Sequence, residues 1–218
     1  MNSNDVLRLI EEGEGFEIEF KRKVPSPEKI ARTMIAFANT HGGHILFGVD
    51  DDGSIAGVES EKSEVNLIRD AGLMFCRPEI EPEIDIVAFD GLDVIVAYIP
   101  ESDAKPHTFE ESGNGEETKV FIRVNDKTVI ASKEVVRILR DERLDAPPMQ
   151  IEIGENERQL FDFLDRNGRI TSKEFSRLVN ISEQRASRIL VSLVRAGVVR
   201  IHTLEKADFF TLASDVHP

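Results

Sequence analysis

The stretch from Ala36 to Gly57, AFANTHGGHILFGVDDDGSIAG, constrains the fold more than any other part of the chain. It begins with the apolar end of a helix and continues through a glycine pair, where the backbone can leave the helix at positive φ. Residues 44–49 then form a nearly unbroken apolar run, which predicts a strand buried on both faces. Three aspartates and a glycine follow as a turn before a short second strand. A helix, a core strand and an acidic turn are therefore expected in direct succession.

The residues on either side of this stretch predict further helices and strands. Apolar and charged residues alternate over residues 16–21, as in a half-buried strand, which puts Glu17, Glu19 and Lys21 on one face. Ser3 is expected to cap a first helix, and Ser26 precedes a second that begins with proline. Later patterns predict a helix at 61–75, a hairpin at 83–98, a strand at 119–124 and a helix capped by Ser132 that ends near Arg143. This mixture predicts an α+β domain over residues 1–145.

A proline pair in residues 146–150 marks a linker, and residues 151–218 have the pattern of a second, smaller domain. Three helices are predicted there, with a tight turn at Asn180-Ile181 between the last two. Two strands at 198–203 and 209–212 follow, joined around Glu205-Lys206. This order is that of a winged helix-turn-helix, a fold that binds DNA in some proteins and other proteins in others.

Charge and cysteine content limit the function classes. The net charge is −14, and residues 150–218 hold 10 basic and 10 acidic residues, so the whole excess of negative charge lies in residues 1–149. This argues against a general polyanion binder and leaves the second domain better suited to nucleic acid. The single cysteine, Cys76, excludes an internal disulfide and is expected in the core. With no apolar run of membrane-spanning length and no secretory signal, we expect a cytoplasmic protein without a membrane partner.

The third helix of the second domain carries the predicted DNA contacts. Its apolar stripe faces the domain core, which leaves Glu183, Ser187 and Ser192 among the outward residues. Gln184 and Arg185 suit base edges, because their side chains can form paired hydrogen bonds there. The residues that suit phosphates are Lys173, Ser182, Arg188, Arg200 and Lys206. The alternative is that these side chains form ordinary solvated helix faces.

Several short motifs of residues 5–143 together resemble the Schlafen AlbA domain, which has also been described as a divergent AAA-type DNA-binding domain. Within the family, such a domain is often followed by a winged helix in transcriptional regulators. The resemblance thus implies a mixed α/β domain plus a small winged-helix domain. The motifs are Glu14 with Glu19-Phe20-Lys21, Ala36-Phe37-Ala38-Asn39-Thr40, Gly42-Gly43, Phe47-Gly48-Val49-Asp50, Asp52-Gly53, Gly57, Lys105-Pro106-His107 and Phe121-Ile122-Arg123-Val124 with Thr128.

The same resemblance implies a second function, because some Schlafen proteins cut transfer and ribosomal RNA with three carboxylates. The corresponding residues here are Glu14, Glu19 and Asp50, with Lys21 as a nearby cation. Clustered carboxylates can hold Mg²⁺ or Mn²⁺ and activate water for phosphodiester cleavage. The chain departs from those nucleases in having one acidic lobe and no zinc ligands, so it would have to dimerise to form a comparable groove.

Two interpretations therefore stand beside each other. The favoured one is a non-enzymatic, homodimeric, DNA-binding transcriptional regulator that needs no cofactor and whose first domain senses a ligand, dimerises or binds nucleic acid. The alternative is a metal-dependent endoribonuclease acting on RNA. An ordinary turn at Asp50 to Gly53 would leave the carboxylates purely structural. ATP hydrolysis is not expected, since the chain has no GxxxxGK[ST] phosphate loop.

Overall fold

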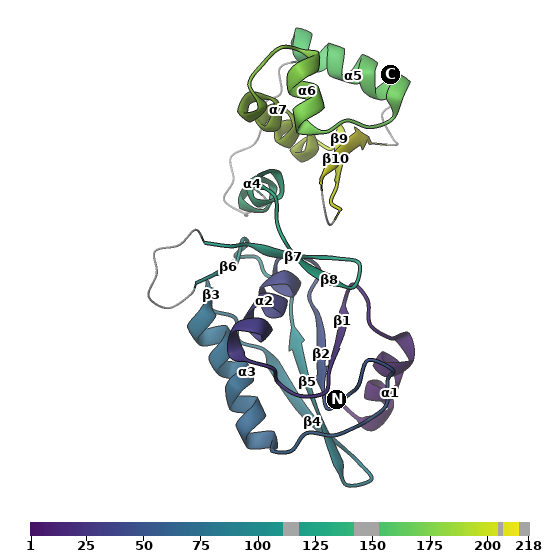
Figure 1. Ribbon diagram of the computed structural model, residues 1–218, viewed down its shortest axis with the longest axis vertical. Coiled ribbons are helices and arrows are strands. Elements are labelled where there is room, and N and C mark those ends of the chain that lie inside the picture. The colour runs from purple at the N-terminus through teal and green to yellow at the C-terminus, as the bar shows by residue number, and fades with distance from the viewer. Residues whose placement is uncertain (111–117, 142–152, 205–206, 214–218) are drawn as a thin grey trace. The chain divides into compact units, whose positions relative to one another are not determined.

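The computed structural model describes residues 1–110, 118–141, 153–204 and 207–213. The chain divides into two compact units, Met1–Ala131 and Ser132–Pro218 (Figure 1). This division lies ahead of the boundary expected after residue 145. Helix α4 (Lys133–Asp141), which was expected to close the first domain, therefore belongs to the second unit. The expected linker at 146–150 lies outside the described residues.

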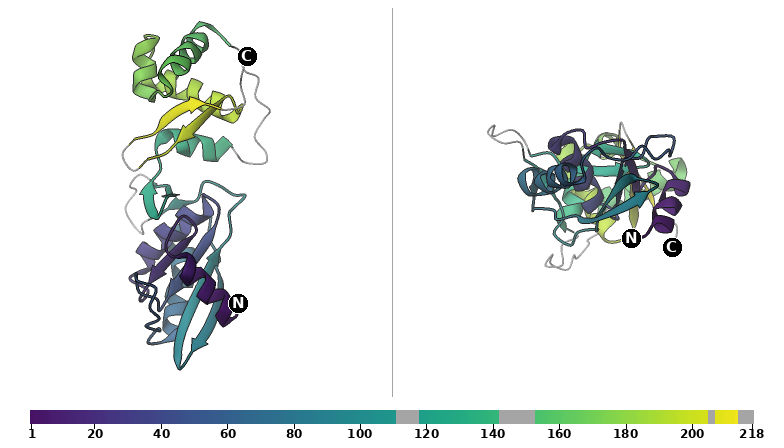
Figure 2. Two further views of the ribbon diagram at one scale, coloured as in Figure 1. Left: turned by 90° about the vertical axis from the view of Figure 1, so that its right-hand side faces the viewer. Right: turned by 90° about the horizontal axis from the view of Figure 1, so that it is seen from below.

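A four-stranded sheet forms the centre of the first unit, in the order β1-β2-β5-β4. Strand β1 pairs parallel to β2, and the other two pairs are antiparallel. Helices α2 and α3 cover one face, and α1 lies on the other (Figure 1); Figure 2 shows α1 in front of the sheet. The elements are α1 (Ser3–Glu12), β1 (Ile18–Lys21), α2 (Pro27–Ala38), β2 (Gly43–Phe47), α3 (Glu61–Phe75), β4 (Glu83–Phe89) and β5 (Leu92–Ile99).

Strand β2 is buried on both faces, as its apolar run predicts. Ile45 and Phe47 pack in the core beneath α2 and α3, while Leu46 packs in the core beneath α1, and all three are fully buried. The strand is shorter than expected. Beyond it, Val49 forms an isolated bridge with Ile55, so the predicted second strand is a single pair of residues.

The glycine pair before β2 is needed for two different reasons. Gly42 has a φ of 77°, in the left-handed region that glycine adopts without a steric penalty. Gly43 lies so close to its neighbours that a Cβ atom there would be 2.7 Å from the backbone oxygen of Glu17 and 2.6 Å from the Phe37 ring. The pair thus ends α2 and lets β1 and α2 pack directly against the start of β2.

Local capping rules predict most helix starts correctly. Ser26 caps α2, with Pro27 at its first position, as expected. The first helix is capped by Asn2 and not by Ser3: the Asn2 side chain accepts the backbone N–H groups of Asn4 and Asp5. The hairpin predicted at 83–98 is confirmed, and its turn lies at Asp90-Gly91, with both residues at positive φ.

Two small strand pairs complete the first unit. Strand β7 (Phe121–Val124) forms an antiparallel hairpin with β8 (Lys127–Ile130), a strand that was not predicted. The short strands β3 (Cys76–Arg77) and β6 (Thr108–Phe109) pair with each other. Burial raises the pKa of the Cys76 thiol to about 12, so this cysteine is a protonated core residue, as expected.

The second unit contains four helices and one antiparallel strand pair among its described residues. Ile170 forms a bridge with Phe210, so the segment before α6 lies beside the hairpin. Thr171 caps α6 in a capping box with Glu174, and Ser182 caps α7. Besides α4, the elements are α5 (Glu155–Asn167), α6 (Ser172–Leu178), α7 (Glu183–Arg195), β9 (Val199–His202) and β10 (Phe209–Leu212).

Candidate functional site

Glu19 of β1 is the counter-ion of a buried arginine. Its Oε2 accepts Arg123 Nη1 at 2.7 Å, and its Oε1 pairs with Lys21 Nζ at 2.6 Å. The Arg123 side chain is 1% exposed, and its guanidinium carbon lies 4.9 Å from the centre of the Phe37 ring. The same guanidinium also donates to Gly15 O and to Thr128 Oγ1. The predicted common face of Glu19 and Lys21 is confirmed. The carboxylate on this face pairs with Arg123 and so holds the β7–β8 hairpin against β1.

Glu14 has a structural partner as well. Strand β1 is an edge of the sheet, so the backbone N–H groups on its outer side need acceptors from elsewhere. Glu14 Oε1 supplies one of them, because it accepts the N–H of Phe20 at 2.8 Å. The carboxylate thereby covers part of an otherwise open strand edge.

Asp50 belongs to an ordinary hydrogen-bonded turn. Its backbone oxygen accepts the N–H of Gly53 at 2.8 Å, and its carboxylate pairs with the exposed Arg22 at 3.1 Å. Within the same turn, Asp52 accepts both the N–H and the hydroxyl of Ser54. These are the local side-chain bonds that aspartate makes in turns, so the geometry agrees with the structural alternative for this segment.

The family resemblance implies that Glu14, Glu19 and Asp50 share one metal site. Among the described residues, no three His, Cys, Asp or Glu side chains form a group that could hold a metal ion. Each of these carboxylates has its own partner in the protein: a backbone N–H for Glu14, a buried guanidinium for Glu19 and a surface guanidinium for Asp50.

A second buried polar cluster connects three of the motifs that the sequence presents separately. The Asn39 side chain donates to His107 O at 2.9 Å and to Phe121 O at 3.0 Å, and it accepts the N–H of His107 at 2.7 Å. His107 Nδ1 lies 2.8 Å from Pro78 O, and Nε2 lies 2.7 Å from Ser102 Oγ. Burial lowers the pKa of His107, so the ring is neutral, donating from Nδ1 and accepting at Nε2.

The sequence presents Asn39 only as a member of the Ala36–Thr40 motif, with no partner indicated. The one sequence signal of burial was that this amide directly follows an unbroken apolar run. In the folded chain, Asn39 is 2% exposed. A buried amide with this many bonds joins the end of α2 to both the His107 segment and β7.

The predicted DNA-contacting residues of the second unit divide into three groups. Gln184, Arg185 and Arg188 are exposed on α7, as expected. Lys173 on α6 and Arg200 on β9 are exposed too. Ser182 acts as the helix cap, since its Oγ accepts the N–H of Arg185 at 3.3 Å, while Lys206 lies outside the described residues.

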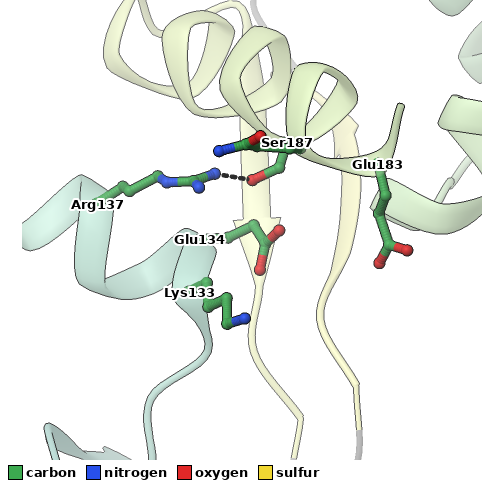
Figure 3. Close-up of a pocket in the computed structure, with 6 residues that line it drawn as sticks. Lys133, Glu134, Arg137, Glu183 and Ser187 are labelled. Carbon is green, nitrogen blue, oxygen red and sulfur yellow. Dashed lines mark hydrogen bonds between the residues drawn. The ribbon is translucent and has the colours of Figure 1, made fainter. Parts of the chain in front are cut away.

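Ser187 was expected to point outward, and that prediction is wrong. It is 3% exposed, because α4 packs along this side of α7 and Arg137 Nη1 donates to Ser187 Oγ (Figure 3). Ser132, which directly precedes α4, donates its hydroxyl to the carboxylate of Asp208. A groove of about 360 Å³ remains beside the contact, lined by Lys133, Glu134, Arg137, Glu183, Gln184 and Ser187.

The helix α7 therefore has one side covered by α4 and another that remains open. The groove on the covered side is lined by two carboxylates, Glu134 and Glu183, and by two cations, Lys133 and Arg137, so it offers no net positive charge to phosphates. Arg185 and Arg188 lie away from the covered Ser187 in the helical repeat and are exposed. Any nucleic-acid contact made by α7 is thus expected from the arginine side.

The hairpin of the second unit carries a stacked row that sequence reasoning missed. The rings of His202 and Phe209 are 4.7 Å apart and nearly parallel, with an interplanar angle of 6°. The guanidinium of Arg169 lies 5.5 Å from the centre of the Phe209 ring. Only the paired strands bring these residues together, and the sequence signal was limited to an aromatic pair at Phe209-Phe210.

The model of the family described as Schlafen, AlbA_2 matches residues 14–132, which is more than half of the chain. The chain belongs to the Schlafen AlbA_2 family. The matched segment ends where the first unit ends, so the Schlafen AlbA_2 domain contains the Glu19–Arg123 pair and the Asn39–His107 cluster, and α4 follows it.

Two solved structures resemble this chain at low sequence identity. One is the solution structure of the N-terminal domain of a protein from Nitrosomonas europaea, which is named as related to the ATP-dependent DNA helicase RecG. It has 21% identity and a TM-score of 0.43, and the match covers 69% of this chain and 95% of that one. The other is the DIP2311 protein from Corynebacterium diphtheriae, with 17% identity and a TM-score of 0.46, covering 69% of this chain and 36% of that one. No curated protein matches the chain. None of the described helices is long and apolar enough to cross a membrane.

Proposed function

We propose that the chain is a DNA-binding transcriptional regulator in which the second unit is a winged helix that reads duplex DNA with α7. The observation that carries this proposal is the open side of α7, where Arg185 and Arg188 follow a capped helix start, while Gln184 is exposed beside the α4 groove. Helix α6 precedes it across a tight turn in which Asn180 has a φ of 52°. This helix–turn–helix order, followed by the β9–β10 hairpin, is that of winged-helix DNA readers.

The charge distribution supports the same assignment. From Ser132 to the end, the chain has 14 basic and 14 acidic residues, whereas the first unit holds the entire net charge of −14. The second unit therefore approaches a phosphate backbone without net repulsion, and the placement of its arginines decides the contact. Arg185 can form paired hydrogen bonds with a guanine edge, while Arg188 and Lys173 suit phosphates.

For the Schlafen AlbA_2 domain we propose a sensing and dimerising role. Strand β4 is the edge strand opposite β1 in the four-stranded sheet, and Ile86 on it is 47% exposed. An exposed strand edge is a surface through which two copies can pair. No observation on the described residues favours the endoribonuclease alternative, since Glu14 and Glu19 are occupied by protein groups.

Fluorescence anisotropy with labelled duplex DNA from the region upstream of the protein's own coding sequence tests the proposal. We expect Arg185→Ala combined with Arg188→Ala to weaken specific binding by about 10- to 100-fold, because a good base contact contributes roughly 1–3 kcal/mol. Arg158→Ala, a change of another exposed arginine on α5, is the matched control and should bind normally. A homodimer would protect two half-sites about 10 base pairs apart in a footprint.

Unchanged affinity in the double variant would reject α7 as the reading helix. If the wild-type chain binds upstream duplexes no better than unrelated ones of equal length, the regulator assignment itself fails.

A further inference from the structure

The outer face of the β9–β10 hairpin holds a continuous row of three side chains. Phe210 and Val199 are buried, so the residues that alternate with them, Phe209 and His202, point to the opposite face. The Ile170–Phe210 bridge places Arg169 on that outer face too, on the side of β10 away from β9. Phe209 thus lies in the middle, between the guanidinium of Arg169 and the imidazole of His202.

This row is ordered and its two ends are exposed. His202 is stacked on Phe209, and its Nε2 lies 2.9 Å from Thr211 Oγ1, which sets the plane of the imidazole. Arg169 and His202 are both exposed, whereas Phe209 is half-buried between them. A flat group could therefore extend the stack at either end without displacing a packed side chain.

The charges on this face suit an anionic partner. Arg200 lies opposite Thr211 in the register and is exposed on the same face as His202. Glu174, whose pKa is lowered mainly by its hydrogen bonds to Thr171 and in part by the charge of Arg169, is held by the N-terminal capping box of α6. Cationic groups beside stacked planar rings are the combination that binds unpaired nucleotides, since rings stack on bases and arginines pair with the backbone.

We propose that the outer face of β9–β10 is a stacking platform for unpaired bases of single-stranded DNA. A base stacks on the exposed imidazole of His202 or the exposed guanidinium of Arg169, with Phe209 supporting both. This contact is separate from the proposed reading of duplex DNA by α7, because none of its residues lies on that helix. Every base has a π face, so the platform does not select a sequence.

The test uses the full chain and a fluorescein-labelled thymidine oligonucleotide of about 12 nucleotides at low salt. We expect Phe209→Leu, which keeps an apolar side chain but removes the ring, to weaken binding about tenfold. Phe209→Tyr keeps the ring and should bind as the wild type does. The Arg185→Ala, Arg188→Ala double variant should retain the oligonucleotide while losing duplex affinity, so failure of either proposal is seen separately.

A second readout uses the absence of tryptophan from the chain. In Phe209→Trp, the only indole sits within the platform, and its fluorescence should be quenched when the oligonucleotide is added. The readout remains informative if Phe209→Leu fails to fold. Absence of binding by the wild type, equal affinity of Phe209→Leu, or an unquenched indole would each overturn the platform.

Discussion

Arg123 in the first unit and the α7 arginines in the second unit have opposite surroundings. Arg123 in the first unit is almost fully buried, binds Glu19, Gly15 and Thr128, and lies over an aromatic ring. Arg185 and Arg188 in the second unit are exposed on the open side of α7. The first arrangement uses charge to hold elements together, while the second leaves charge accessible to a partner.

This difference also explains the carboxylates of the first unit. Glu14 and Glu19 match a family pattern associated with catalysis, yet one covers a strand edge and the other neutralises Arg123. A carboxylate that satisfies a buried cation cannot be released at low cost, because the cation would remain unpaired in a poorly solvated site. Residue type alone therefore does not separate a structural carboxylate from a catalytic one.

The largest effect that would test the comparison is expected from Arg123→Met. Removing the cation leaves Glu19 without its buried partner and the oxygen of Gly15 without a donor, so we expect a loss of about 3–5 kcal/mol in the free energy of unfolding. Urea denaturation followed by circular dichroism measures it. The control is Arg22→Met, which breaks the exposed pair with Asp50 and should cost less than about 1 kcal/mol.

Equal effects of the two methionine variants would contradict the distinction between buried and exposed pairs. The measured stabilities also bear on how a loss of activity in a Glu19 variant is interpreted. Since Glu19 is the counter-ion of Arg123, loss of any activity in Glu19→Ala has to be compared with the stability of that variant.

An intermediate effect is expected on lowering the pH, through His107. Burial lowers its pKa from the ordinary value of 6.5, and the hydrogen bond to Pro78 opposes this only in part. The unfolded chain then binds more protons than the folded chain, so the stabilisation is fully present above pH 6.5 and is lost as the pH falls through and below that value. Urea unfolding from about pH 7.5 to about pH 5.5 measures the slope.

The control for this prediction is His107→Gln, which cannot titrate and should lose less stability over the same interval. His44, whose pKa burial also lowers, contributes with the same sign and stays in the variant, so part of the slope should persist. An unchanged slope would show that His107 is not a buried neutral group.

The smallest effect is expected at the exposed arginines. Arg185→Ala with Arg188→Ala should change the free energy of unfolding by no more than about 0.5 kcal/mol per site, because surface changes away from packed features are nearly neutral. Thermal unfolding beside the DNA-binding assay checks this. A large loss of stability would show that Arg185 and Arg188 are structural, as Arg123 is, and would contradict the contrast between the two units.

Much of the fold follows from short-range patterns in the sequence. The core strand β2, the glycine pair before it, the caps at Ser26, Thr171 and Ser182, and the turn at Asp90-Gly91 all lie where propensity and periodicity predict them. Each depends on neighbours within a few residues, so the local sequence contains the information. The family motifs likewise predict the membership that the family model confirms.

The candidate sites could be predicted only in part, since exposure depends on what packs against each residue. The helical repeat correctly exposes Arg185 and Arg188 but also exposes Ser187, because it contains no sign that α4 packs there. The strand pattern likewise could not reveal that Glu19 meets Arg123, which lies 104 residues further along the chain.

The sequence by itself determined most of the helices and strands, most of the helix caps, and the acidic and neutral parts of the chain. Tertiary structure decided which charges are buried and which remain available, and it alone assembled the Asn39–His107 cluster and the Arg169–Phe209–His202 row. The physical reason is that periodicity specifies which face of an element is apolar, whereas a polar side chain acquires its partner only when distant elements pack together.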